Sequence, residues 1–141
     1  MIRVRVDRGL DPIGRTRLAG EILVAYLAAA RELRRRPIEV VVTRLRRGPG
    51  STAGSASPRD LGESMRLGRA VIRVLRFLPG DTRCLRRSLV LLQLLSRRGI
   101  PASLVIAARS GPDFVAHAWL EYDGLPVLPP ADGSFGRLVE L

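Results

Sequence analysis

The residues of this sequence best suited to chemistry are its single cysteine, Cys84, and its single histidine, His117. A thiol beside an imidazole is the minimal apparatus for nucleophilic acyl transfer, in which the sulfur attacks a carbonyl carbon. If the two side chains meet, the chain is a cysteine peptidase or an acyltransferase. If they do not, both have ordinary alternatives, because a lone cysteine is usually a small buried apolar residue and a lone histidine on a strand is usually structural.

Cys84 opens an apolar stretch, DTRCLRRSLVLLQLLSRRG, that is typical of a helix. Asp81 or Thr82 is the expected N-cap, and Gly99 is the expected end. Apolar residues lie nearly all round this helix, which predicts burial on most sides. The helix dipole and the unpaired N–H groups of the first turn favour an anion beside Cys84.

Three arginines surround the cysteine in sequence: Arg83, Arg86 and Arg87. Positive charge at a helix N-terminus is unfavourable because it opposes the helix dipole. Three such charges at one helix end suggest a functional role. These side chains could stabilise a thiolate, bind an acidic stretch of substrate, or extend into water.

His117 lies in a run that alternates like a strand, with Val115, Trp119 and Glu121 on the same face. Strands are predicted over residues 102–108, 114–122 and 125–128. Asp123 and Gly124 form a strong hairpin signal between the last two. A helix followed by consecutive strands predicts an α+β fold in which the cysteine-bearing helix packs on a small antiparallel sheet.

The N-terminal half is predicted to be mainly helical. A short edge strand is expected at residues 2–6. A helix is expected over 16–36, with Thr16 as its cap and with an apolar face made of Leu18, Ile22, Ala25, Tyr26, Ala29 and Leu33. The segment over 38–47 has a pattern that fits strand or helix and favours helix. Residues 48–58 are rich in Gly, Ser and Pro and predict a flexible linker. A further helix is expected to about residue 78, with Asp60 as cap, Glu63 completing a capping box and Met65 on its apolar face. We therefore expect a helical portion over 1–47, a linker over 48–58 and a core over 59–141, together one compact domain.

All 24 basic residues are arginines, and 13 acidic residues leave a net charge of +11. This surplus indicates either an acidic partner or a compositional bias. A nucleic-acid-binding module is an alternative, but the aromatic residues are few and no recognised binding motif occurs.

One cysteine excludes an intramolecular disulfide and a cysteine–histidine metal site, and we expect no cofactor. No apolar run approaches the ~20 residues of a membrane span. We therefore expect a cytoplasmic protein without stable membrane insertion.

Three motifs in order, CLRRSL, RRGIPA and HAWLEYDG, resemble the transglutaminase-like leader peptidases of lasso-peptide biosynthesis, over residues 79–127 above all. The resemblance implies a papain-like or transglutaminase-like core with Cys84 as nucleophile and His117 as general base. It implies cleavage of a precursor peptide at the junction of leader and core. It also implies a leader-recognition protein and an ATP-dependent lasso cyclase as partners. Arg83, Arg86, Arg87 and Trp119 are the predicted substrate-binding residues.

One departure from the family pattern concerns the third member of the catalytic triad. The family places an acidic residue on the strand after the histidine, where this chain has Leu128-Pro129-Pro130. Asp132 could substitute if the segment bends back, and Asp123 is the other candidate, although turn geometry alone explains it. The missing acid leaves open a catalytically impaired scaffold that binds the precursor without cutting it.

Overall fold

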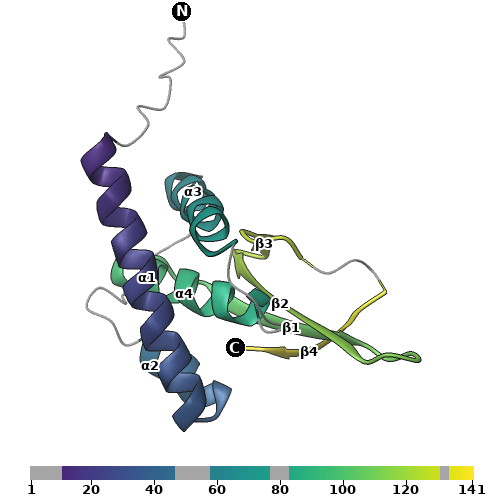
Figure 1. Cartoon of the computed structure of the whole chain (residues 1–141). Coiled ribbons are helices and arrows are strands. Elements are labelled where there is room, and N and C mark those ends of the chain that lie inside the picture. The colour runs from purple at the N-terminus through teal and green to yellow at the C-terminus, as the bar shows by residue number, and fades with distance from the viewer. Residues whose placement is uncertain (1–10, 47–57, 77–82, 131–133) are drawn as a thin grey trace, which may run out of the picture.

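Within the described residues, four helices precede a four-stranded sheet, as the predicted α+β class requires (Figure 1). The computed structural model describes residues 11–46, 58–76, 83–130 and 134–141. The helices are α1 (Pro12–Arg35), α2 (Ile38–Arg46), α3 (Pro58–Leu75) and α4 (Arg83–Arg97), and the strands are β1 (Ser103–Arg109), β2 (Val115–Tyr122), β3 (Leu125–Pro126) and β4 (Gly136–Glu140). The strand predicted at 2–6, the linker up to residue 57, and Asp81 and Thr82 lie outside the described residues.

Helix α1 begins four residues before the predicted start. The Asp11 side chain caps it by accepting a 2.8 Å hydrogen bond from the N–H of Gly14. Thr16 is not the cap, because its hydroxyl lies inside the helix and donates to the carbonyl of Pro12. The predicted apolar face is confirmed, since Ile22, Ala25 and Ala29 are fully buried. The ambiguous segment after α1 is the helix α2.

Helix α3 begins at Pro58, so Asp60 lies within its first turn and is not the predicted cap. Glu63 likewise forms no capping box and instead pairs with Arg66 at 2.8 Å. Met65, expected on the buried face, is 42% exposed, whereas Gly68 is buried. A methyl group on Gly68 would meet the carbonyl oxygen of Val127 at 2.4 Å. Only glycine allows the helix to approach the segment after β3 so closely.

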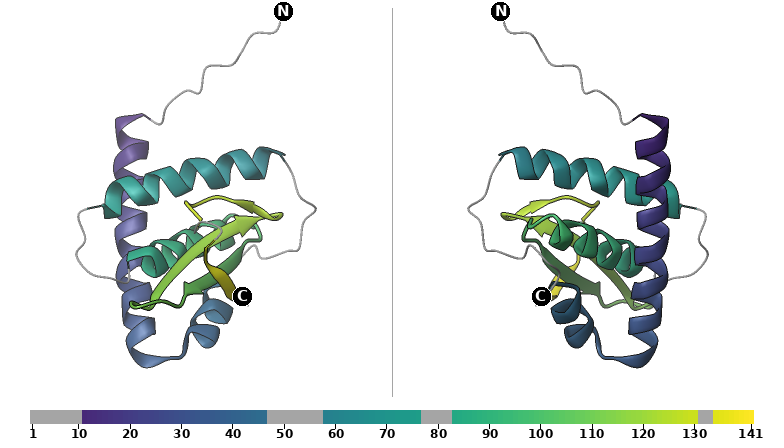
Figure 2. Two further views of the ribbon diagram at one scale, coloured as in Figure 1. Left: turned by 90° about the vertical axis from the view of Figure 1, so that its right-hand side faces the viewer. Right: turned by 90° about the vertical axis from the view of Figure 1, so that its left-hand side faces the viewer.

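Helix α4 is the centre of the molecule, because it contacts α1, α2, α3 and the sheet. Figure 2 shows α4 against one side of the sheet, with the sheet in front of it in one view and behind it in the other. Its fully buried apolar residues are Leu89, Val90, Leu91, Leu92, Leu94 and Leu95. Burial on most sides is therefore confirmed, and Gly99 ends the helical segment with a positive φ of 70°.

The sheet is antiparallel, with strand order β3-β2-β1-β4. Asp123 and Gly124 have φ values of 51° and 77°, which confirms the predicted tight turn between β2 and β3. Strand β3 is shorter than expected and ends at Pro126. Strand β4 was not predicted, and it pairs with the free edge of β1.

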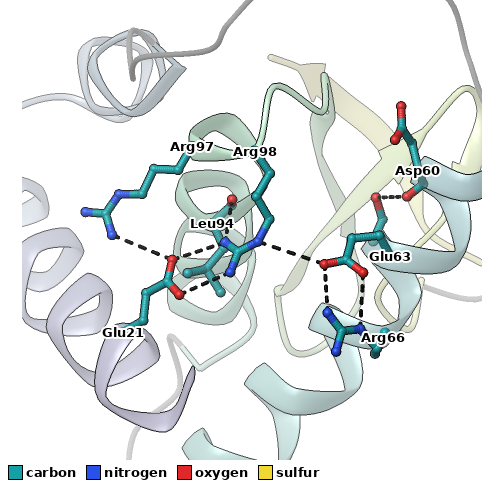
Figure 3. Close-up of polar contacts among 8 residues, drawn as sticks. Glu21, Asp60, Glu63, Arg66, Leu94, Arg97 and Arg98 are labelled. Atoms are coloured by element: carbon teal, nitrogen blue, oxygen red, sulfur yellow. Dashed lines mark hydrogen bonds and ion pairs between the residues drawn. The ribbon is translucent and has the colours of Figure 1, made fainter. Parts of the chain in front are cut away.

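An ion-pair network joins three helices at the C-terminal end of α4 (Figure 3). Arg98 binds Glu21 of α1 through two contacts of 3.1 Å and lies 3.9 Å from Glu63 of α3. Arg97 lies 3.9 Å from Glu21, and Glu63 also accepts from Arg66. We call these five side chains the α4 C-terminal junction. Each arginine in it has a carboxylate partner.

Candidate active site

Cys84 is the second residue of α4 and is half-buried at the edge of the hydrophobic core. Its carbonyl accepts a 2.8 Å hydrogen bond from the Ser88 hydroxyl one turn later. The first N–H groups of a helix have no intrahelical acceptor. The thiol therefore lies beside backbone donors that the helix itself does not use.

The ring of His117 is held by a backbone carbonyl. Its Nε2 lies 2.8 Å from the oxygen of Pro129. The turn after β2 returns the chain alongside that strand, and the N–H of Val127 donates to the carbonyl of Leu120. Because a carbonyl oxygen only accepts, Nε2 carries the proton, and Nδ1 of the neutral ring keeps its lone pair. Nδ1 is the nitrogen that can act as a base.

A buried network supports the same ring from a second direction. His117 stacks on Trp119 with ring centroids 5.9 Å apart and an interplanar angle of 25°. The indole N–H of Trp119 donates to Glu121 at 3.0 Å, and Arg137 of β4 donates to the same carboxylate at 2.8 Å. Trp119 is only 4% exposed, so it offers little surface to a substrate and chiefly supports His117.

Sequence reasoning missed Arg137, because β4 itself was not recognised. Five exposed residues give no burial pattern for a strand. The available signal was the buried Glu121, an acid on an apolar strand that required a cationic partner.

The fold brings the elements of Cys84 and His117 together. Helix α4 packs on β2, and a short turn joins it to β1, whose Ala107 pairs with His117. Cys84 lies about 20 Å from that turn, measured along α4, and Ala107 lies about 13 Å from it, measured along β1. Cys84 and the Ala107–His117 pair therefore both lie away from the turn that joins α4 to β1. Within the described residues the thiol and the ring share no hydrogen bond; such bonds are often long without substrate and shorten when it binds.

No acidic side chain orients His117 among the residues that the structure describes. Asp132 lies outside them. Asp123 is exposed in the turn at the far end of β2, roughly 20 Å along the strand from His117, so the alternative third member is not in contact with the ring. The carbonyl of Pro129 fills the orienting position instead.

Of the arginines near Cys84, Arg83 is the first residue of α4. Arg86 donates to the hydroxyl of Tyr26 at 2.9 Å, and the Nε atoms of Arg86 and Arg87 are buried without a partner. Their binding of substrate stays a prediction.

Two features are absent from the described segments of the chain, residues 11–46, 58–76, 83–130 and 134–141. These segments hold no group of three or more metal-ligating side chains. None of their helices has the length and apolar character needed to cross a membrane.

The chain matches the model of a known protein family. The model of the family described as "Transglutaminase-like superfamily" matches residues 23–140, a range that contains α4, Cys84, His117 and the sheet. No curated protein and no solved structure matches the chain.

Proposed function

Because the chain belongs to the transglutaminase-like superfamily, we propose that it is a cysteine peptidase with Cys84 as nucleophile and His117 as general base. The observation that carries the proposal is the 2.8 Å contact between Nε2 of His117 and the oxygen of Pro129. This contact fixes the tautomer in which Nδ1 can accept the thiol proton. In a catalytic triad an acidic side chain fixes the tautomer of the histidine in the same way. An orienting carbonyl removes the need for Asp132 or Asp123.

The reaction proceeds in two half-reactions. Nδ1 of His117 takes the thiol proton while the sulfur bonds to the scissile carbonyl carbon, whose oxygen gains the negative charge. The C–N bond then breaks, and the imidazolium gives its proton to the departing amine. Water loses a proton to Nδ1 and attacks the resulting thioester. The C–S bond breaks, which releases the acid and restores Cys84.

The negative oxygen of the tetrahedral intermediate needs donors that are already in place. The N–H of Cys84 lies in the first turn of α4, where backbone donors have no intrahelical acceptor. We assign it as one oxyanion donor. Water molecules in place of this N–H would stabilise the charge far less, because they must reorient as the charge develops.

The substrate that fits best is the precursor of a lasso peptide, cut between leader and core. The motifs CLRRSL, RRGIPA and HAWLEYDG support this substrate, because all three occur in the order seen in those leader peptidases. A leader-recognition protein would deliver the precursor, and an ATP-dependent cyclase would receive the released core. The positive net charge of +11 suits an acidic leader or an acidic partner surface.

The test compares Cys84→Ala with the native chain in precursor cleavage, with the leader-recognition protein present and the released leader measured by mass spectrometry. Loss of the nucleophile should lower cleavage by roughly a thousandfold or more. Native enzyme quenched during turnover should carry the mass of a thioester adduct on Cys84. Undiminished cleavage by Cys84→Ala would refute the proposal.

Asp123→Asn is the matched control, since asparagine tolerates the positive φ of 51° at this position. It should leave cleavage within about twofold, because the residue only shapes the turn. A precursor that binds but stays intact, together with a Cys84 thiol inert to iodoacetamide, would favour the scaffold alternative.

A further inference from the structure

A basic hollow of about 330 Å³ lies between α1 and the first turn of α4. We call it the Tyr26–Arg86 groove. Its wall includes Tyr26, Leu27, Arg31, Arg34, Arg35 and Arg86. Arg31, Arg34 and Arg35 follow one another at helical spacing on the same side of α1. Four guanidinium groups from two helices therefore surround one cavity.

The arginines on α1 in this groove have no acidic partner. In the described part of the chain, Arg31, Arg34 and Arg35 form no ion pair or side-chain hydrogen bond. The neighbouring Arg36 behaves differently, because it pairs with Glu32 at 3.1 Å. Four positive charges at one place repel each other, and an anionic ligand in the groove would offset this repulsion.

Arg86 is already oriented for such a ligand. It donates to the Tyr26 hydroxyl at 2.9 Å, and its guanidinium carbon lies 5.8 Å from the centre of the Tyr26 ring. Its Nε is buried without a partner. Fixing the guanidinium in advance lowers the entropy lost on binding, and a planar fork of donors suits a carboxylate.

The groove also continues into an apolar surface. Val24 and Leu27, one helical turn apart on α1, are 61% and 67% exposed. A ligand that covers both parts carries carboxylates and apolar side chains, as an acidic peptide does. Nucleic acid fits less well, because the groove offers one aromatic ring and exposed aliphatic side chains.

We propose that the Tyr26–Arg86 groove binds an acidic, partly apolar segment of the peptide substrate, as a site separate from the catalytic centre. The inference rests on the proposed peptidase function. Cys84 and Arg86 are two residues apart and therefore project from nearly opposite sides of α4. A helix with its side chains is about 10–12 Å across, so at least about four extended residues must join the bound segment to the scissile bond.

The test measures equilibrium binding to the full-length Cys84→Ala chain, which cannot turn over. The probe is a fluorescein-labelled synthetic peptide in which glutamate alternates with leucine and serine, and anisotropy reports binding. Arg31→Glu/Arg35→Glu should weaken binding by roughly tenfold or more, because two charge-assisted contacts become repulsive. The matched control is Arg69→Glu/Arg73→Glu on α3, which has the same spacing and charge change at exposed positions. The control should change affinity by less than about twofold.

Three outcomes would overturn the inference. Equal loss in both double variants would show non-specific attraction, and no loss in the groove variant would show that the site is unused. Tighter binding of a single-stranded oligodeoxynucleotide, lost in the groove variant, would assign the groove to nucleic acid. Arg31→Gln/Arg35→Gln repeats the test if the reversed charges prevent folding, as judged by circular dichroism. Because no step needs cleavage, intact binding with an inactive native enzyme would refute the peptidase function and leave the groove in place.

Discussion

The two ends of α4 carry the same residue type in opposite settings. At the C-terminal end, Arg97 and Arg98 face Glu21 and Glu63, and their charge also suits the negative end of the helix dipole (Figure 3). At the N-terminal end, arginine opposes the dipole, and the Nε atoms of Arg86 and Arg87 are buried without a partner.

The difference indicates what each group of arginines does. Where the fold supplies a carboxylate, the arginine forms an ion pair with it and holds the helices together. Where the fold supplies none, the charge is retained at a local cost, and that cost is recovered only when an anionic ligand binds. The N-terminal end also carries Cys84, so Arg86 and Arg87, whose Nε atoms have no partner, are close in sequence to the proposed chemistry.

The largest expected effect comes from disturbing the packing of α3 against the segment after β3. Gly68→Ala places a methyl group 2.4 Å from the carbonyl oxygen of Val127, which is backbone and cannot rotate away. We expect a loss of about 2–3 kcal/mol in the free energy of unfolding in urea. Cleavage should also fall, because Val127 leads directly to the Pro129 carbonyl that orients His117.

Gly62→Ala on the same helix is the matched control, since nothing lies within 4 Å of its added methyl group. It should stabilise the chain by up to about 1 kcal/mol through helix propensity. Equal effects of the two alanines would remove the packing argument.

A smaller effect is expected from the C-terminal junction. Arg98→Ala removes the contacts to Glu21 and Glu63 and a 3.0 Å bond to the carbonyl of Leu94. The unfolding free energy should fall by about 1–2 kcal/mol, because these side chains are about two-thirds buried. Arg97→Ala removes one contact of 3.9 Å and should cost less than about 0.5 kcal/mol.

The smallest effect on stability is expected at the other end of the same helix. Arg86→Ala removes a hydrogen bond and a cation–π contact with Tyr26, but it also removes a charge that opposes the dipole. The two lost contacts are each worth about 0.5–1 kcal/mol, and removing the opposed charge together with the buried, unpartnered Nε returns a similar total, so the unfolding free energy should change by less than about 0.5 kcal/mol. Affinity for the acidic peptide should fall. If Arg86→Ala destabilises the chain as much as Arg98→Ala, the contrast between the two ends is incorrect.

Much of the fold could be predicted from the sequence, because apolar spacing and turn residues act locally. The buried face of α1, the buried α4 and the Asp123-Gly124 turn follow from residues within one or two turns of each other. Local signals failed where a distant partner decided the outcome. Gly68 is buried because the segment after β3 lies against it, and β4 exists because β1 offers a free edge.

The candidate site divides in the same way. The sequence by itself determined which residues could react, since the chain has one thiol and one imidazole, and it placed the thiol at a helix start. Only the tertiary structure decided what orients His117. The sequence showed a proline where an acid was expected, because it displays side chains, whereas the group that binds Nε2 is a backbone carbonyl. A carbonyl is present at every residue, and only the folding of the chain determines which one meets the ring.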